Sequence, residues 1–434
     1  MQPIIAHIDM NSYFATCEQQ DNPAWRGKPI GVCEHLGGII IAPSIEAKRW
    51  GIKTAMPVWE ARKLYPKIIL TKTNPDRYRF YTARFLKVFA DYTDRIEKYS
   101  IDEAFLDLTK ACNIRGFKNG VLQNLDPWQE AARMAREIKT RMKTEVGDWI
   151  TCSVGISYSK LVAKIASDLQ KPNGLVIVRP EDRDSLYDRL SLTDIPGIGY
   201  RQERNLNKLG IYTLKDLRDY PLSKLVSHFG IAGYHLHSMG QLQGSWKEGF
   251  GEDVVATPLK SMGHMYTVPM EYRQKKILRP VLYKLSEMVA ARLRANDLMG
   301  NHIYAHAYNG DEVHAGRGAK IGYYVQDGRD IYLEALALLG STANLRELEN
   351  QTYFVGVTVG GLAPFAPQAS LFEDIPRRQR LAIALDKINQ KYEDFTVARV
   401  PAFLARDIIR DSVGFGRMKE FKITFMRGGR GRFR

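Results

Sequence analysis

The sequence is poor in cysteine, in long apolar runs and in acidic residues. Its 434 residues include only four cysteines, which lie far apart and form no C-x-x-C pair. This pattern argues against zinc knuckles and against a disulfide framework. No apolar run of roughly 18 residues occurs, and the N-terminus MQPIIAHIDM lacks the basic and apolar regions of a signal peptide. We therefore expect a cytoplasmic protein with reduced thiols and no membrane-spanning segment.

The shortage of acidic residues gives the chain a strong positive charge. There are 63 Lys and Arg residues against 48 Asp and Glu, a formal net charge of +15. Such an excess predicts a polyanionic partner, either nucleic acid or an anionic membrane surface. Because no membrane-spanning run is present, nucleic acid is favoured. The length predicts roughly three domains.

The stretch YSIDEAFLDL, residues 99–108, places two carboxylates, Asp102 and Glu103, among apolar residues. Adjacent side chains of a strand point to opposite faces, so both acids can converge on one object only at a bend such as a hairpin tip. Carboxylates among core residues are costly unless they are paired or bind a cation. The alternative is a solvated acidic turn, which is the commoner case for an isolated pair. A third carboxylate, Asp9 at the end of a strand predicted over 4–9, shifts the balance toward a metal site.

The order of predicted elements around these acids indicates an α+β sheet with helices on one face. An inserted segment occupies 13–78, a helix is predicted over 79–98, and a second helix begins at Asp126 and Pro127. The strand TCSVGIS and the basic stretch SKLVAKIASDLQKPNG follow. Three carboxylates close to basic helices are what two-metal nucleotidyl transfer requires, and oxygen ligands suit Mg²⁺.

Two further patterns lie in the second half of the chain. Asp194 to Leu217 carries a G-I-G turn at Gly197 and Gly199, typical of a helix–hairpin–helix that contacts DNA phosphates through backbone N–H groups. An ordinary turn between two helices is the alternative. After a linker at 244–252, strands are predicted at 259–268, 302–309, 319–326 and 353–360, with helices at 275–296 and 328–340, in a β-α-β-β-α-β order.

Taken together, the sequence resembles the Y-family translesion DNA polymerases. The matching pieces are HIDMNSYFATCE, EAKRWGIKTAMP, YSIDEAFLDLT, SVGIS, AKIASDLQKPNG, DIPGIG and KSMGHMYT, in that order along nearly the whole chain. The resemblance implies a right-hand fold: palm at 1–12 and 79–179, fingers at 13–78, a thumb with the helix–hairpin–helix at 180–243 and a little finger at 253–365. Residues 366–434 would form a clamp-binding peptide and a basic C-terminal tail.

The resemblance also implies roles for individual residues. Asp9, Asp102, Glu103 and the Met10 carbonyl look like ligands of two Mg²⁺ ions, for which Mn²⁺ is a substitute, and the first three are the candidate catalytic residues. Ser12, Tyr13 and Phe14 match the turn that cradles the triphosphate, with Phe14 at the steric gate against a ribose 2′-OH; core packing is the plainer role for that ring. Lys171 of KPNG matches the triphosphate-contacting lysine. Gly197, Gly199 and Lys160 are candidate DNA contacts.

The fingers depart from the polymerase IV pattern. Polymerase IV relatives tend to show T-x-x-Y-x-x-R there, whereas this chain has Ala42, Ile45 and Lys48, closer to the polymerase V catalytic subunit. Lysine lacks the bidentate fork of arginine, and Ile45 offers no hydrogen bond. We therefore expect weaker nucleotide binding than the polymerase IV pattern gives.

The peptide QASLF at 368–372 resembles the Q-x-x-L-F motif by which bacterial polymerases dock on the sliding β-clamp. Leu371 and Phe372 would fill an apolar pocket and Gln368 would bind at its rim. A hydrophobic anchor that packs on its own domain would look similar, and residues 376–434 allow either folding back or partner binding.

The sequence as a whole predicts a monomeric, template-directed DNA polymerase that adds dNTPs to a primer 3′ end on primer–template DNA. No segment is left for a proofreading exonuclease, so we expect low fidelity and a role in DNA damage tolerance. The alternative is a catalytically weak scaffold bound to DNA and to the clamp. A nucleotide cyclase does not explain the G-I-G turn, the QASLF peptide or the charge.

Overall fold

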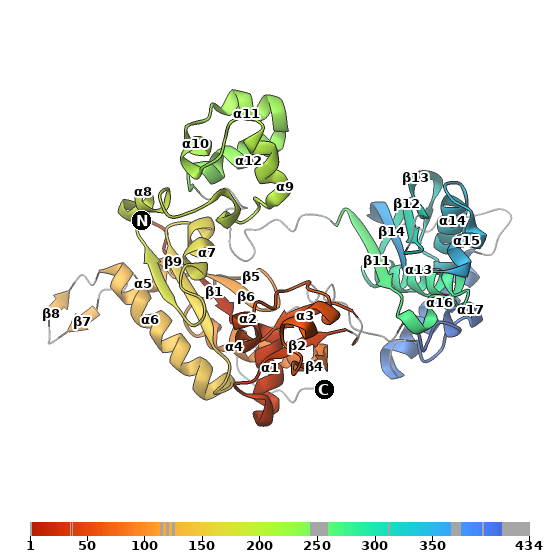
Figure 1. The fold of residues 1–434 in the computed structure, drawn as a ribbon, viewed down its shortest axis with the longest axis horizontal. Coiled ribbons are helices and arrows are strands. Elements are labelled where there is room, and N and C mark those ends of the chain that lie inside the picture. Colours follow the sequence, from red (N-terminus) through yellow and green to blue (C-terminus); the bar gives the residue numbers. More distant parts are fainter. Residues whose placement is uncertain are drawn as a thin grey trace. The chain divides into compact units, whose positions relative to one another are not determined.

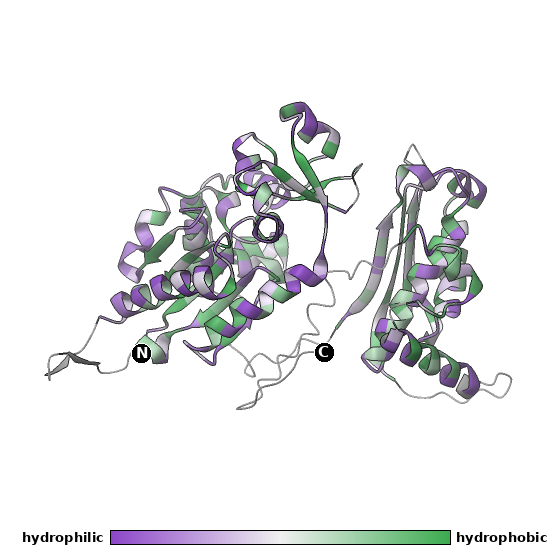
Figure 2. Ribbon diagram, turned by 90° about the horizontal axis from the view of Figure 1, so that it is seen from below, coloured by the Kyte–Doolittle hydropathy of each residue, from purple (hydrophilic) through white to green (hydrophobic). Residues whose placement is uncertain are grey.

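The computed structural model describes residues 2–34, 36, 38–112, 116–118, 121–123, 126–243, 259–310, 313–365, 375–392 and 395–409. Those up to 243 belong to one compact unit, called unit 1, and those from 259 to a second, called unit 2 (Figure 1). In both units the strands and inner helix faces are rich in apolar residues, while polar stretches mark the outer helices (Figure 2). Within the described ranges, no helix has the length and apolarity needed to cross a bilayer.

The main sheet of unit 1 has the strand order β10-β9-β1-β6-β5. The strands are β1 (Ile5–Met10), β5 (Ile96–Lys98), β6 (Glu103–Asp107), β9 (Cys152–Ser157) and β10 (Leu175–Val178). β1 lies at the centre, antiparallel to β6 and β9, with Asp9 opposite Glu103. The predicted strand at 4–9 and the acidic hairpin are therefore both present, and they are neighbours.

Helices cover both faces of this sheet, so the prediction of helices on one face is wrong. Ala6, Ile8 and Met10 of β1 pack in the core formed with α4 (Pro75–Ala90) and α6 (Pro127–Arg141). The alternate residue Ile5 packs with Ala163 of α7 (Lys160–Asp168) on the opposite face. A Cβ at Gly155 of β9 would lie 2.1 Å from the Ala163 carbonyl oxygen, so α7 sits directly on the strand. Helices were not expected on this second face, because beside Ile5 it carries the polar residues His7 and Asp9.

Helix boundaries follow local capping signals. The carboxylate of Asp126 accepts a hydrogen bond from the Trp128 N–H at the start of α6, as the sequence predicts. The helix predicted over 79–98 begins earlier, because Asn74 caps α4 and Pro75 fits its first turn. It also ends earlier, at Ala90, because residues 96–98 pair with β6 instead. α1 (Tyr13–Asp21) and α5 (Thr109–Cys112) complete this part, with β7 (Gly116–Lys118) and β8 (Val121–Gln123) forming a separate two-stranded sheet.

A smaller sheet, β3-β2-β4, lies within the segment predicted as fingers. It has its own core, which includes Cys33, Ile40, Ala47, Ile52 and Val58. Its elements are β2 (Ile30–Cys33), β3 (Ile40–Pro43), β4 (Ile69–Lys72), α2 (Ile45–Arg49) and α3 (Val58–Leu64).

The remainder of unit 1 is a small helical region. It contains α8 (Arg183–Leu186), α9 (Tyr200–Asn207), α10 (Leu214–Asp219), α11 (Leu222–Phe229) and α12 (Ile231–Gly240). In the G-I-G turn Gly197 has φ +103°, which favours glycine, and Gly199 caps α9. The segment before this turn is a short 3-10 helix, Leu192–Asp194, rather than the full helix that the pattern predicts.

Unit 2 has the predicted β-α-β-β-α-β order, in a sheet ordered β11-β14-β12-β13. The elements are β11 (Ser261–Thr267), α13 (Leu278–Ala295), β12 (Leu298–Tyr308), β13 (His314–Val325), α14 (Gly328–Gly340), α15 (Leu345–Asn350) and β14 (Phe354–Pro364).

The chain after β14 folds back on unit 2. α16 (Ile375–Tyr392) and α17 (Val400–Phe403) are joined to it by ion pairs, among them Arg399 with Asp327 at 2.9 Å and with Glu287 at 3.1 Å. Ala405, Ile408 and Ile409 enter the core of the unit. Of the two possibilities for residues 376–434, folding back therefore holds up to residue 409, and the predicted basic C-terminal tail lies outside the described residues.

Candidate functional site

Three carboxylates from the predicted site lie close together at one end of the neighbouring strands β1 and β6. Asp9 is the penultimate residue of β1, and Glu103, the first residue of β6, is its cross-strand partner. Asp102 precedes Glu103 in the β5–β6 turn, where its carbonyl oxygen accepts a hydrogen bond from the Met10 N–H at 2.9 Å. This bond ties the hairpin tip to the end of β1 and explains why residues almost a hundred positions apart meet.

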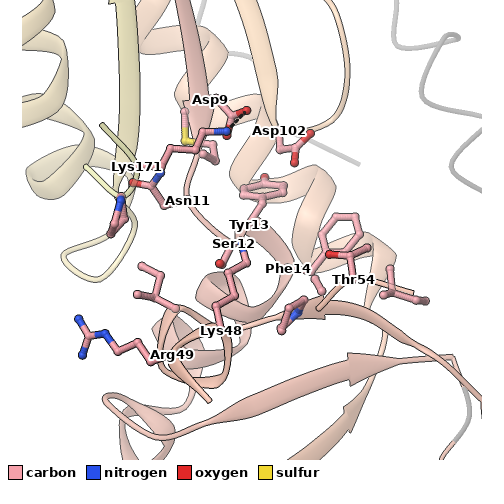
Figure 3. A pocket seen from close by; sticks show the side chains of 16 residues that line it. Asp9, Asn11, Ser12, Tyr13, Phe14, Lys48, Arg49, Thr54, Asp102 and Lys171 are labelled. Atoms are coloured by element: carbon pink, nitrogen blue, oxygen red, sulfur yellow. Dashed lines mark hydrogen bonds and ion pairs between the residues drawn. The ribbon is translucent and has the colours of Figure 1, made fainter. Parts of the chain in front are cut away.

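Asp9 and Asp102 line a pocket of about 610 Å³ (Figure 3). Lys48 and Arg49 approach it from α2, and Lys171 approaches from the loop between α7 and β10 (Figure 3). Ten of the eleven residues predicted to bind metal or nucleotide line this pocket, and Glu103 is the exception. The ten are Asp9, Met10, Ser12, Tyr13, Phe14, Ala42, Ile45, Lys48, Asp102 and Lys171.

Lys171 is held across the pocket mouth by two carboxylates. Its Nζ lies 2.8 Å from Asp9 Oδ2 and 2.6 Å from Asp168 Oδ1. Burial by itself lowers the pKa of Lys171, but the two carboxylates outweigh burial and raise it. The loop that carries Lys171 is fixed by Asn11, whose side-chain oxygen accepts from the Asn173 N–H at 2.8 Å. Lys171 is therefore a fixed positive charge beside Asp9.

Glu103 is held by a histidine and a lysine behind the pocket. His7 Nε2 lies 3.0 Å from Glu103 Oε2, and the Lys164 ammonium pairs with the same oxygen. Burial raises the pKa of Glu103, but hydrogen bonds from His7 and Lys164 outweigh it and lower the pKa to about 2. Burial lowers the pKa of His7 against the effect of Glu103, and Nε2 donates to Glu103 because an ionised carboxylate can only accept. His7 Nδ1 lies 2.8 Å from Ser167 Oγ, and the hydroxyl of Ser167 donates to the Lys164 carbonyl oxygen at 2.7 Å.

The pKa of Asp102 is shifted in the opposite direction to that of Glu103. Burial raises the pKa of this carboxyl, and the nearby negative charges of Asp9 and Glu103 raise it further, against a hydrogen bond from the Ser100 hydroxyl. Carboxylates that repel one another indicate a local excess of negative charge, which a divalent cation would relieve.

The donor chemistry therefore fits a hard cation such as Mg²⁺, but the side chains are not arranged as a ligand set. Across the described part of the chain, no group of three or more His, Cys, Asp or Glu residues is placed to hold a metal ion. The reason is local: Lys171 occupies an oxygen of Asp9, and Lys164 occupies one of Glu103. Each ammonium group occupies a position where a metal ion would bind. A metal can therefore bind through these oxygens only if the two lysines move.

The same pocket also contains cations and a hydroxyl. Ser12 has a left-handed backbone (φ 47°, ψ 47°), and its buried Oγ has no hydrogen-bond partner among the described residues. Burial lowers the pKa of Lys48, and the charge of Lys171 lowers it further, against the effect of Asp9. An unpartnered hydroxyl and two cations that repel one another are suited to an anionic ligand.

Phe14 lies beside these groups with its ring stacked on Tyr78. The ring centroids are 4.3 Å apart and the planes differ by 16°. The ring is half-buried, packs against the core and also lines the pocket, so core packing and contact with a ligand are compatible.

Several residues of the site did not emerge from the sequence as site residues. These are His7, Asn11, Arg49, Thr54, Lys164 and Ser167. His7 had one available signal, since it lies two positions before Asp9 and so shares its face of β1. Lys164 and Ser167 had no such signal, because α7 was not expected on that face of the sheet.

The remaining predicted contacts lie elsewhere. Gly199 is open to solvent, with no atom within 4 Å of an added Cβ. Lys160 is 7% exposed and pairs with Glu97, so the structure gives no support to a DNA contact by this ammonium. The clamp-binding residues Gln368, Leu371 and Phe372 lie outside the described residues.

Comparison with known proteins assigns the chain to a protein family. Residues 8–168 match the impB/mucB/samB family, and 259–371 match the C-terminal domain of that family. Residues 193–241 match the thumb domain of DNA polymerase-iota. A relative from Moorella thermoacetica, described as DNA polymerase IV, is 34% identical over 409 residues, covering 92% of this chain and 96% of the relative. One from Pelotomaculum thermopropionicum, with the same description, is 30% identical over 411 residues, covering 94% and 97%. This chain belongs to the Y family of DNA polymerases.

A solved structure supports the same assignment for the fold. The Y-family DNA polymerase chimera of Dbh and Dpo4 superimposes with a TM-score of 0.67 at 26% identity, covering 83% of this chain and 99% of that one. The chain is a DNA-directed DNA polymerase of the translesion type, and the α+β right-hand fold predicted from its motifs is confirmed. The exact domain boundaries and the residue roles stay predictions.

Proposed function

We propose that this Y-family polymerase adds dNTPs to a primer 3′ end by two-metal nucleotidyl transfer, with low fidelity, in the bacterial cytosol. The observation that carries the proposal is the pocket itself. Two carboxylates, Asp9 and Asp102, line it together with Ser12, Lys48 and Lys171, and the Lys171 ammonium lies 2.8 Å from Asp9 Oδ2. This combination of carboxylates and ammonium groups suits a cation bound next to the phosphates of a nucleotide.

Each group has a role in this proposal. Asp9, Asp102, Glu103 and the Met10 carbonyl would hold two Mg²⁺ ions, with Mn²⁺ as a substitute; when bound, the ions supply Lewis acidity and charge neutralisation. Lys171 leaves Asp9 to bind the incoming triphosphate. Lys164 yields its oxygen of Glu103, while His7 keeps that carboxylate in place. Glu103 would help to hold the ion that lowers the pKa of the primer 3′-OH, and would not act as an independent base.

The backbone after β1 provides the phosphate cradle. The N–H groups at the start of α1, from Tyr13 onward, point out of the helix end beside the unpartnered Ser12 hydroxyl. Phe14 forms the steric gate against a ribose 2′-OH. Ala42 and Ile45 line the same pocket without offering a hydrogen bond, which supports a loose grip on the nucleotide and low fidelity.

Partners are proposed on the same basis. Primer–template DNA would contact the exposed backbone at Gly197 and Gly199. The sliding β-clamp would bind QASLF, and the protein would act as a monomer. A pulldown tests the clamp contact: Leu371→Ala with Phe372→Ala should abolish it, and undiminished binding would remove the motif from this role.

A primer-extension assay tests the catalytic proposal. Asp102→Ala should extend primers at least about a hundredfold more slowly than wild type, because one of the carboxylates that hold the metal ions is lost. Asp76→Ala, at an acidic side chain that is 87% exposed, is the matched control and should extend normally. If neither wild type nor Asp102→Ala extends a primer while both bind DNA equally, the chain is a scaffold and the proposal fails.

A further inference from the structure

The helix α16 lies beyond the part of the chain that the family comparison covers. The match to the C-terminal domain of the family ends at residue 371, whereas α16 begins at residue 375 and lies beside α13 (Figure 1). Of its side chains that the structure describes, only that of Ala382 is buried. Helices in proteins owe most of their stability to the packing of an apolar face. α16 has little of that packing within its own unit.

Polar contacts attach one side of α16 to unit 2. Arg378 Nη2 lies 2.8 Å from Asp330 Oδ1, and the Arg294 guanidinium lies 2.5 and 2.7 Å from the two oxygens of Asp386. The side chain of Asn389 exchanges two hydrogen bonds, each of 2.9 Å, with the backbone of the loop that follows the helix. The residues on this side recur every three or four positions, so they form the face that points toward the unit.

A second face of α16 carries an apolar row, which we call the α16 seam. Its members are Leu381, Leu385, Ile388 and Tyr392, spaced four, three and four residues apart. Leu381 is 55% exposed, Ile388 38% and Tyr392 57%, and Leu385 is half-buried. Single exposed apolar side chains are ordinary. This spacing, however, is that of the a and d positions along which two helices pack in a coiled coil, so the seam fits another helix.

The positions that border the seam carry positive charge and no negative charge. They are Arg377, Ala384 and Lys391 on one side and Ala382 and Asn389 on the other. Arg377 and Lys391 are both exposed. In a coiled coil the charges at these bordering positions, called e and g, determine which helices pair and in which direction. The border of the seam therefore favours a helix that carries acidic side chains.

We propose that the α16 seam is a docking surface for an acidic amphipathic helix of a partner protein. Such a helix would bury its own apolar row against the seam and place carboxylates opposite Arg377 and Lys391. A second copy of this chain fits less well. An antiparallel pair would bring Arg377 and Lys391 together, which are like charges, and a parallel pair would place Lys391 opposite the uncharged Asn389. The surface belongs to unit 2, so the proposal does not depend on nucleotidyl transfer by unit 1.

Nucleic acid and lipid also suit the seam less. Leucine and isoleucine side chains offer no flat ring on which a base could stack. A bilayer that took up the seam would also cover the neighbouring ion pairs of Arg378 with Asp330 and of Arg294 with Asp386, and the burial of charged groups in lipid is costly. A protein helix can cover the seam and leave these pairs as they are.

Fluorescence anisotropy of labelled synthetic peptides, titrated with the full chain, tests the surface. The two probes are helical peptides of about three heptads with leucine at the a and d positions. One carries glutamate at the e and g positions, and the other carries lysine there. The acidic peptide should bind at least about tenfold more tightly than the basic one, because like charges at an interface repel. Added salt should reduce this difference.

Two isoleucines of the same helix provide a matched pair of variants. Ile388 is 38% exposed and belongs to the seam, whereas Ile383 is 47% exposed and lies outside it. Ile388→Asp should weaken binding of the acidic peptide at least about tenfold. Ile383→Asp should leave that binding unchanged, and circular dichroism should show both variants folded. Lys391→Glu should weaken binding of the acidic peptide about two- to fivefold and strengthen binding of the basic peptide.

The results that overturn the proposal are distinct. Equal binding of the two peptides, or binding of neither, would exclude an acidic helix as the occupant. Equal weakening by Ile383→Asp and Ile388→Asp would mean that the seam is not the contact. Analytical ultracentrifugation that shows a wild-type dimer and an Ile388→Asp monomer would assign the seam to a second copy of the chain. Phosphatidylglycerol vesicles that bind wild type but not Ile388→Asp, without binding of the acidic peptide, would assign it to lipid.

Discussion

His7 offers the sharpest test of how the site is built. The side chain is fully buried, and its Nε2 lies 3.0 Å from Glu103 Oε2. We predict that His7→Leu slows nucleotide insertion while leaving the fold intact, because leucine fills the space but cannot hold the carboxylate. A hydrogen bond to an ionised acceptor contributes about 1.5–3 kcal/mol. If that contribution is fully expressed in the transition state, kcat falls about 10- to 150-fold.

The lower kcat of His7→Leu should result from a displaced Glu103 side chain and not from a change in its protonation. Lys164 still pairs with Glu103 in the variant, so this carboxylate stays ionised at neutral pH and raising the pH should not restore the rate. The Mg²⁺ concentration for half-maximal activity should rise, and Mn²⁺ binding followed by electron paramagnetic resonance should weaken in parallel.

Single-nucleotide insertion at saturating dNTP, as a function of Mg²⁺ and pH, gives the measurement. His7→Gln is the matched control, because its amide can donate to Glu103, and it should recover most of the rate. Urea unfolding of both variants checks the fold. A His7→Leu protein with wild-type kcat and wild-type Mg²⁺ dependence would refute the reasoning.

Three further predictions concern the nucleotide grip and the C-terminal helices. Phe14→Ala should reduce discrimination against ribonucleotides at least about tenfold, since the gate is lost; an unchanged ratio of dNTP to rNTP insertion efficiency removes Phe14 from this role. Ile45→Tyr combined with Lys48→Arg should lower the KM for dNTP, because a hydroxyl and a bidentate guanidinium are added, and steady-state kinetics without such a decrease contradict it. In unit 2, burial raises the pKa of Asp327, but Arg399 outweighs burial and lowers it. Asp327→Asn should therefore lose about 2 kcal/mol of unfolding free energy at pH 7, and urea melts should show this gap closing as the pH falls below about 4, the unfolded pKa; a pH-independent gap argues against the ion pair.

Much of the candidate site was readable in the sequence because its signals are local. Asp9 lies near the end of a strand, and Asp102 and Glu103 lie between apolar residues, so residue type and position already indicated the hairpin. Asp126 and Pro127 fix the start of α6 through capping chemistry that involves only neighbouring residues. The β-α-β-β-α-β order of unit 2 followed from hydrophobic alternation alone, and the structure has it.

What the sequence could not determine are contacts that depend on which face of a strand meets which helix. One face of β1 carries Ile5, His7 and Asp9, and this mixed pattern does not indicate that α7 packs against it. Lys164, which contacts Glu103, and Ser167, which contacts His7, were therefore not predicted. The sequence also did not determine where the C-terminal helices pack. An amphipathic helix has the same sequence pattern whether it packs on its own domain or on a partner. Only the tertiary structure decides these points, since burial and ion pairing are set by residues far apart in the chain. The sequence therefore identifies the family and the candidate carboxylates. The pairing of Lys164 with Glu103 and of Lys171 with Asp9 follows only from the packing of the folded chain.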